Sequence, residues 1–168
     1  MEAKMFFSHG NRQSRGVAIF TTESSGLDVS NISHDVDGRW ILGEISWNNE
    51  TYSIASVYAP NDLMARGHFF DGLTDLINGN DNCIVGGDFN CDLDNQNLKD
   101  RSKTILHNVL IEKDLVDAWR IIYPENPGFT HFHKVYNKAS RIDYVFTSSH
   151  LLNSTEGLSD HHVVNVRI

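Results

Sequence analysis

The chain has 168 residues, a size typical of a single domain with a substantial hydrophobic core. Its composition, 40% hydrophobic and 21% charged, is that of a globular protein, and no apolar run reaches the length of a membrane span. The formal net charge of −8 argues against a simple basic nucleic-acid binder, but it permits a protein whose clustered carboxylates hold a divalent cation.

The first half of the chain favours strands followed by one helix. Residues 1–14 show little periodicity, whereas residues 16–20 form an apolar run typical of a buried strand. A polar connection, rich in Ser and Asp, then extends to Gly38. Residues 40–47 and 52–58 predict a hairpin, which Pro60 ends because proline cannot donate to the strand ladder. Between residues 65 and 78, apolar side chains recur on one helical face.

The second half mixes helices and strands. Residues 83–85 predict a buried strand, and Ser102 is expected to cap a helix after a polar loop. Residues 115–122 predict a short helix or turn. Strands are expected at residues 129–133, 141–146 and 163–168. With no repeat and no linker, residues 1–168 are expected to form one α/β domain, with sheets at the centre and helices outside.

The two cysteines, Cys83 and Cys91, are too few for a disulfide framework, and Cys83 lies in the apolar strand as a small buried side chain. The first seven residues are too short and too interrupted for a signal peptide. Together these features predict an intracellular protein, nuclear or cytoplasmic, that is not secreted.

The strand at residues 83–85 leads through two glycines to Asp88 and Asn90. Residues two apart on an extended chain share a face, so these side chains should point together beyond the strand's C-terminal end. Such ends are where sites form in α/β sheets, and a carboxylate beside an amide suits a phosphate and its metal. An ordinary turn is the alternative. A calcium-binding loop is excluded because Leu93 and Lys99 replace the Gly and Glu that it needs.

Other predicted strand ends also carry polar groups: Tyr58, Asp143, and the neighbours Asp160 and His161. Each has a structural alternative. Tyr58 would also suit a half-buried core position, Asp143 would suit the surface or a pairing with Arg141, and Asp160 would suit a turn. Phosphodiester hydrolysis needs an activated water, stabilised charge on the phosphate and help for the departing oxygen. The set as a whole covers these roles.

Two histidines, His131 and His133, share a face of a predicted strand. They are interpreted as solvated or DNA-facing and not as zinc ligands, because no cysteine stands at zinc-type spacing. The charged residues at 99–103 are interpreted as a solvated loop.

Four segments carry a family resemblance: residues 57–61 (Val-Tyr-Ala-Pro-Asn), 87–90 (Gly-Asp-Phe-Asn), 140–144 (Ser-Arg-Ile-Asp-Tyr) and 159–161 (Ser-Asp-His). In this order they resemble the endonuclease/exonuclease/phosphatase superfamily of DNase I-like enzymes. They are most similar to the endonuclease domain of LINE-type non-LTR retrotransposons, and the resemblance covers essentially the whole chain. It implies a four-layer α/β sandwich, two packed mixed β-sheets flanked by helices.

The resemblance implies nicking of DNA with Mg²⁺ or Mn²⁺. It implies that Asp88 would position or deprotonate the attacking water. Asn90 would hydrogen-bond a non-bridging phosphate oxygen, and Tyr58 would stabilise the developing charge close to the phosphate. Thr130 would support contact with the DNA.

The implied metal ligands are Asp160, Asp88 and Asn90. His161 would contact the phosphate and would be oriented by Asp143. The implied partners are DNA and a reverse transcriptase domain in a full-length polyprotein, with the endonuclease domain itself a monomer that does not bind membranes.

The chain departs from the family pattern at its start. The family begins with a strand that carries an Asn, followed by a Gln-Glu pair whose Glu binds the metal, and nothing before Phe6 supplies either. The domain is therefore expected to be incomplete at its N-terminus and to lack the first strands of the family fold. Two alternatives stay open: a catalytically silent remnant that binds nucleic acid or nothing, and another phosphodiesterase or phosphatase of the superfamily.

Overall fold

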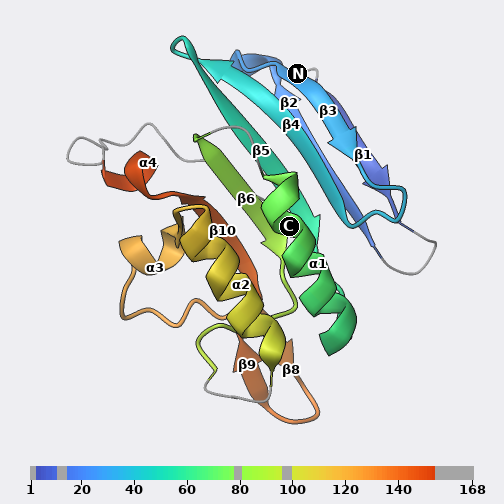
Figure 1. Cartoon of the computed structure of the whole chain (residues 1–168), viewed down its shortest axis with the longest axis vertical. Helices are drawn as coiled ribbons and strands as arrows, with labels where there is room; N and C mark the ends of the chain where they lie inside the picture. The colour runs from blue at the N-terminus through green and yellow to red at the C-terminus, as the bar shows by residue number, and fades with distance from the viewer. Residues whose placement is uncertain (1–2, 11–14, 78–80, 96–99, 154–168) are drawn as a thin grey trace.

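A six-stranded mixed sheet forms the centre of the computed structural model, which describes residues 3–10, 15–77, 81–95 and 100–153 (Figure 1). Its strands, in spatial order, are β3 (Val29–His34), β4 (Trp40–Trp47), β5 (Glu50–Tyr58), β6 (Cys83–Asp88), β10 (Asp143–Ser148) and β7 (Leu115–Asp117). Neighbouring strands are antiparallel except β5 and β6, which run parallel and are joined by a helix.

Two helices, α1 (Leu63–Leu76) and α2 (Arg101–Glu112), lie side by side across one face of this sheet (Figure 1). Asp62 caps α1, because its carboxylate accepts the backbone N–H groups of Met64 and Ala65. Asp100 caps α2 by accepting the N–H of Ser102. The prediction that Ser102 is the cap is therefore wrong: the cap lies two residues earlier, and Ser102 is buried in the first turn of the helix.

Two hairpins complete the described strands. The first pairs β1 (Ala3–His9) with β2 (Gly16–Thr22) and contacts β4 and β5. Ile41 on β4 is fully buried although its side chain alternates away from the helices, which places this hairpin on the opposite face of the sheet. The second hairpin pairs β8 (His131–His133) with β9 (Lys138–Ser140) and lies at the bottom of Figure 1.

Between the sheet and the helices lies a core rich in aromatic side chains. Phe70 from α1, Phe89 after β6 and Phe146 from β10 are fully buried. The Phe89 ring meets Phe146 edge-on at 4.9 Å and Tyr144 edge-on at 5.8 Å between ring centroids. Phe89 stands between Asp88 and Asn90 in the sequence, so this packing fixes the chain segment that carries both.

The sequence predicted most of these elements, and the mixed α/β class is confirmed. The hairpin of β4 and β5 is present, and its turn residues Asn48 and Asn49 have φ values of 50° and 65°, as a two-residue hairpin turn requires. Strands β1, β3 and β9 were not predicted. The prediction of a helix or turn at residues 115–122 is wrong for residues 115–117, which form strand β7 because they pair with β10, and is confirmed for residues 118–122. The short α3 (Ala118–Ile122) and α4 (Ser149–Asn153) complete the described α-helices.

Among the helices described, none is long and apolar enough to cross a membrane. The strand predicted at residues 163–168 lies outside the described residues.

Candidate active site

Three adjacent strands bring three of the predicted site residues together. Tyr58 on β5 is the register partner of Asp88 on β6, and Asp88 is in turn the register partner of Asp143 on β10. Adjacent strands lie about 4.8 Å apart, and register partners point to the same face. The helix-facing residues of β10 are Tyr144 and Phe146, so the three site residues point to the opposite face.

The chain after β6 holds Asn90 beside Asp88. Asn90 has a φ of 48°, a left-handed conformation that Asn tolerates better than most residues. Its backbone N–H donates to Oδ1 of Asp88 at 2.8 Å, and its Nδ2 donates to the carbonyl oxygen of Ala59 at 2.8 Å. A side-chain amide has two N–H donors. Within the part of the chain that the structure describes, one N–H of Asn90 is used, and the second is available to a ligand.

Asp88 is half-buried, and burial raises the pKa of its carboxyl group above the ordinary value of 3.8. The negative charge of Asp143 raises this pKa further. The hydrogen bond from the Asn90 N–H and the nearby His131 act in the opposite direction without cancelling the effect. A carboxylate with a raised pKa is a stronger base than one in open water, and it gains more from a nearby cation.

Tyr58 is held by an arginine that the sequence analysis did not assign to the site. The Arg39 guanidinium lies 5.2 Å from the centre of the Tyr58 ring, and its Nη1 donates to the Tyr58 carbonyl oxygen at 3.1 Å. The Tyr58 N–H donates to the carbonyl oxygen of Arg39 at 2.8 Å. Arg39 therefore contacts the tyrosine at its ring and at its backbone.

Thr130 connects the β8–β9 hairpin to the site. Its hydroxyl oxygen accepts the N–H groups of Ile142, at 3.2 Å, and Asp143, at 3.3 Å. Its own N–H donates to the carbonyl oxygen of Ser140 at 3.0 Å. Thr130 thus holds the start of β10, and the β8–β9 hairpin begins directly after Thr130, close to Asp143.

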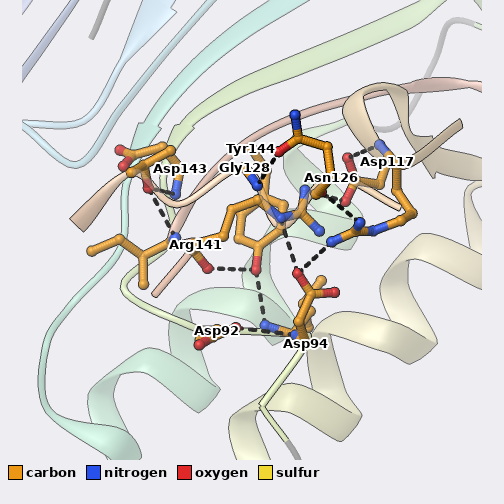
Figure 2. Close-up of polar contacts among 12 residues, drawn as sticks. Asp92, Asp94, Asp117, Asn126, Gly128, Arg141, Asp143 and Tyr144 are labelled. Carbon is orange, nitrogen blue, oxygen red and sulfur yellow. Dashed lines mark hydrogen bonds and ion pairs between the residues drawn. The ribbon is translucent and has the colours of Figure 1, made fainter. Parts of the chain in front are cut away.

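Arg141, two residues before Asp143, is buried in an ion-pair cluster that Figure 2 shows. Its Nε lies 3.1 Å from Asp94 and its Nη1 lies 2.6 Å from Asp117, while Arg120 also pairs with Asp94 at 2.7 Å. Arg141 is therefore not the partner of Asp143, which excludes that alternative reading of Asp143. An open pocket of about 470 Å³ lies beside the cluster, and its lining contains none of the four grouped site residues.

Two predicted site residues, Asp160 and His161, lie outside the described residues. Among the residues that the structure describes, no group of three or more His, Cys, Asp or Glu side chains is arranged to hold a metal ion. Asp88 and Asp143 nevertheless fit Mg²⁺, which typically binds through one or two carboxylates, several waters and substrate phosphates. Burial is the largest cause of the raised pKa of Asp88, and the charge of Asp143 adds to it; a cation would relieve this repulsion.

Comparison with known proteins agrees with this geometry. The sequence matches the Endonuclease/Exonuclease/phosphatase family over residues 4–161. It is 30% identical to the Transposon TX1 uncharacterized 149 kDa protein of Xenopus laevis over 99% of the chain, and the matched part is 14% of that protein. The family predicted from the sequence motifs is therefore confirmed.

Solved structures show the same fold. A 3′-5′ exonuclease, NExo from Neisseria meningitidis, superposes with a TM-score of 0.67 and 16% identity, over 94% of this chain and 75% of that one. The endonuclease domain of TRAS1, a telomere-specific non-LTR retrotransposon, gives a TM-score of 0.64 and 18% identity, over 90% of this chain and 69% of that one. The predicted DNase I-like fold class is thus confirmed.

Proposed function

The chain belongs to the Endonuclease/Exonuclease/phosphatase family, and on this premise we propose that it hydrolyses phosphodiester bonds in DNA with Mg²⁺ or Mn²⁺, as a retrotransposon-type endonuclease. The observation that carries the proposal is the register of Tyr58, Asp88 and Asp143 on three adjacent strands. It sets a base, a cation-binding pair and a phenol O–H on one face of the sheet.

Each residue has a chemical role in this proposal. Asp88, with its raised pKa, orients and deprotonates the attacking water. The second N–H of Asn90 donates to a non-bridging phosphate oxygen, and the Tyr58 hydroxyl stabilises the charge that develops there. Asp88 and Asp143 would hold the cation. When bound, the cation supplies Lewis-acid polarisation of the phosphate and stabilisation of the leaving oxygen.

Residues outside the described part of the chain complete the proposed set. Asp160 would add a carboxylate to the metal, and His161 would contact the phosphate with its ring oriented by Asp143. We also propose that the domain acts within a longer protein that contains a reverse transcriptase. The small share, 14%, of the transposon protein that this chain matches supports that view.

The β8–β9 hairpin supports DNA as the substrate. The chain is acidic overall, but residues 126–140 contain Lys134 and Lys138 and no Asp or Glu. Phe132 and Tyr136 on this hairpin are 67% and 69% exposed. Exposed aromatic rings beside cationic side chains are typical of surfaces that bind nucleic acid. The hairpin starts at Thr130, next to Asp143, so it would hold DNA against the site.

Removing the metal should abolish the activity. In Mg²⁺ or Mn²⁺ the full chain is expected to convert supercoiled plasmid into open circles, and EDTA should reduce the rate to background because the two carboxylates then repel each other and the phosphate. The plasmid assay, with a small phosphomonoester tested in parallel, measures this. Nicking that persists in EDTA, or turnover of the phosphomonoester alone, would contradict the proposal.

Neutralising the hairpin should weaken DNA binding in a salt-dependent way. The double variant Lys134→Ala/Lys138→Ala is expected to reduce the slope of log binding constant against log salt by about 2, since each lost phosphate contact removes about 0.9. Filter binding or fluorescence anisotropy across a salt series measures this slope. Lys4→Ala is the control, because Lys4 on β1 pairs with Asp28 at 2.8 Å. Equal slopes for the double variant and the unmodified chain would exclude this surface.

A further inference from the structure

Arg66, on α1, is a buried cation that the catalytic roles above do not use. It is 4% exposed. Its Nε donates to Oγ of Ser102 at 2.9 Å, and its Nη2 lies 2.7 Å from Oδ2 of Asp100. These two contacts join α1 to the first turn of α2, which lies beside it (Figure 1). A buried charge needs such a partner, and Asp100 supplies it.

The remaining contacts of Arg66 go to the segments that leave the two site strands. Its Nη1 donates to the carbonyl oxygen of Asn61, three residues after Tyr58, at 3.3 Å. The same nitrogen donates to the carbonyl oxygen of Asn90. One guanidinium therefore reaches the chain beyond β5 and the chain beyond β6 at once, from the helical side of the sheet.

We infer that Arg66 is a positioning residue that holds Asn90 in its left-handed conformation, so that the Asn90 amide faces the phosphate; the inference rests on the proposed function. Asn90 is anchored at three points: its N–H at Asp88, its Nδ2 at Ala59 and its carbonyl oxygen at Arg66. Asn adopts a φ of 48° more readily than most residues, but this is a minority conformation that its surroundings must select. Arg66 supplies the contact that holds the Asn90 carbonyl oxygen.

Loss of the Arg66 contact would act on Asp88 as well. The Asn90 N–H that donates to Oδ1 of Asp88 belongs to the same peptide segment whose carbonyl oxygen Arg66 holds. If Asn90 relaxed to a negative φ, both its amide and this N–H would move. The transition-state hydrogen bond and the orientation of the base would then be lost together.

Lysine is the informative replacement. Arg66→Ala would leave Asp100 as an unpaired buried charge, and the resulting unfolding would hide any effect on the site. Arg66→Lys keeps the charge near Asp100, but an ammonium group lacks the planar fork that serves four acceptors at once. Ser102→Ala is the matched control, because it removes a contact of the same guanidinium on the α2 side and leaves the Asn61 and Asn90 contacts in place.

The expected result is a split between the two variants. Arg66→Lys should lower kcat for plasmid nicking by about 10-fold or more, the usual effect of losing a partner that orients a site residue, with KM little changed. Ser102→Ala should change kcat by less than about twofold. In an Asn90→Ala background, Arg66→Lys should cost less activity than in the unmodified chain, because the part of its effect that acts through the Asn90 side-chain amide is already lost.

A second readout does not depend on turnover. The three-bond HN–Hα coupling and the Cα and Cβ chemical shifts of Asn90 report its φ in the metal-free chain. The coupling and the chemical shifts should change in the Arg66→Lys variant and remain unchanged in the Ser102→Ala variant. Unmoved Asn90 signals, or a kcat loss that persists in full in the Asn90→Ala background, would overturn the positioning role. Absence of nicking by the unmodified chain would instead contradict the proposed function, and the Asn90 signals would still decide the role of Arg66.

Discussion

Replacing Asp88 by asparagine is expected to lower the nicking rate by at least about 10³-fold, because the amide cannot accept the proton of the attacking water and, being neutral, holds the cation more weakly than the carboxylate. The fold should survive, since the asparagine Oδ1 still accepts the N–H of Asn90. Plasmid relaxation at saturating Mg²⁺ measures the rate. Asp71→Asn, which changes an exposed carboxylate on α1, is the control and should keep full activity.

The same variant should be more stable than the unmodified chain at neutral pH when metal is absent. The pKa of Asp88 is raised by burial and then by Asp143, so its ionised form is disfavoured in the folded state. Stability is therefore lost as the pH rises through the raised pKa, and it is regained as the pH falls below 3.8, the value of the unfolded chain. The stabilisation by Asp88→Asn should disappear over the same interval.

Urea unfolding in EDTA at pH 7 and at pH 3.5 measures this effect. Asp88→Asn should shift the midpoint upward at pH 7 and leave it unchanged at pH 3.5. A lower midpoint at pH 7 would show that the Asp88 carboxylate stabilises the metal-free fold. That result would contradict the view that Asp88 serves catalysis at a cost in stability.

Replacing Gly87 by alanine should destabilise the fold by about 3 kcal/mol or more, through backbone overlap and strain. Gly87 has a φ of 147°, which L-residues rarely adopt. A Cβ at this position would lie 2.0 Å from the carbonyl oxygen of Val57, on the neighbouring strand β5. Because the obstacle is main chain, it cannot rotate away, and β5 and β6 would separate next to the pair of Tyr58 and Asp88.

Gly72→Ala provides the matched control. Gly72 is exposed on α1, nothing lies within 4 Å of a Cβ built there, and alanine favours the helix, so this variant should gain up to about 1 kcal/mol. Denaturant unfolding of both variants compares them directly. A Gly87→Ala chain as stable as the Gly72→Ala chain would exclude the close approach of β5 to β6.

The sequence predicted the strands that carry the site because they have clear patterns. Residues 83–85 form a short apolar run before two glycines, and residues 52–58 alternate. Strand β1 was missed because most of it is exposed on both faces, so its side chains do not alternate. Strand β3 was missed because Asn31, at a φ of 49°, lies where its pairing with β4 shifts register, and its sequence is polar.

The grouping of Tyr58, Asp88, Asn90 and Asp143 was predicted, because strand ends gather at one edge of a sheet. The two arginines that hold these residues were not assigned, because nothing local indicates them. Arg66 lies in a helix with no charge pattern that distinguishes it, and its partners Asn90 and Asp100 are 24 and 34 residues away. Arg39 contacts Tyr58 from 19 residues away. Such contacts follow only from the tertiary fold.

The aromatic packing on the helix-facing side of β10 fixes the register of this strand against β6. A one-residue slip of β10 against β6 would turn Asp143 toward the helices and bring Tyr144 to the surface. That slip would remove the ring contacts of Tyr144 and Phe146 with Phe89 and would bury the Asp143 carboxylate in their place. The apolar side chains on the helix-facing side of the sheet thus fix the register of Asp88 and Asp143. Substitutions among these core residues would shift the two carboxylates relative to each other without contacting either of them.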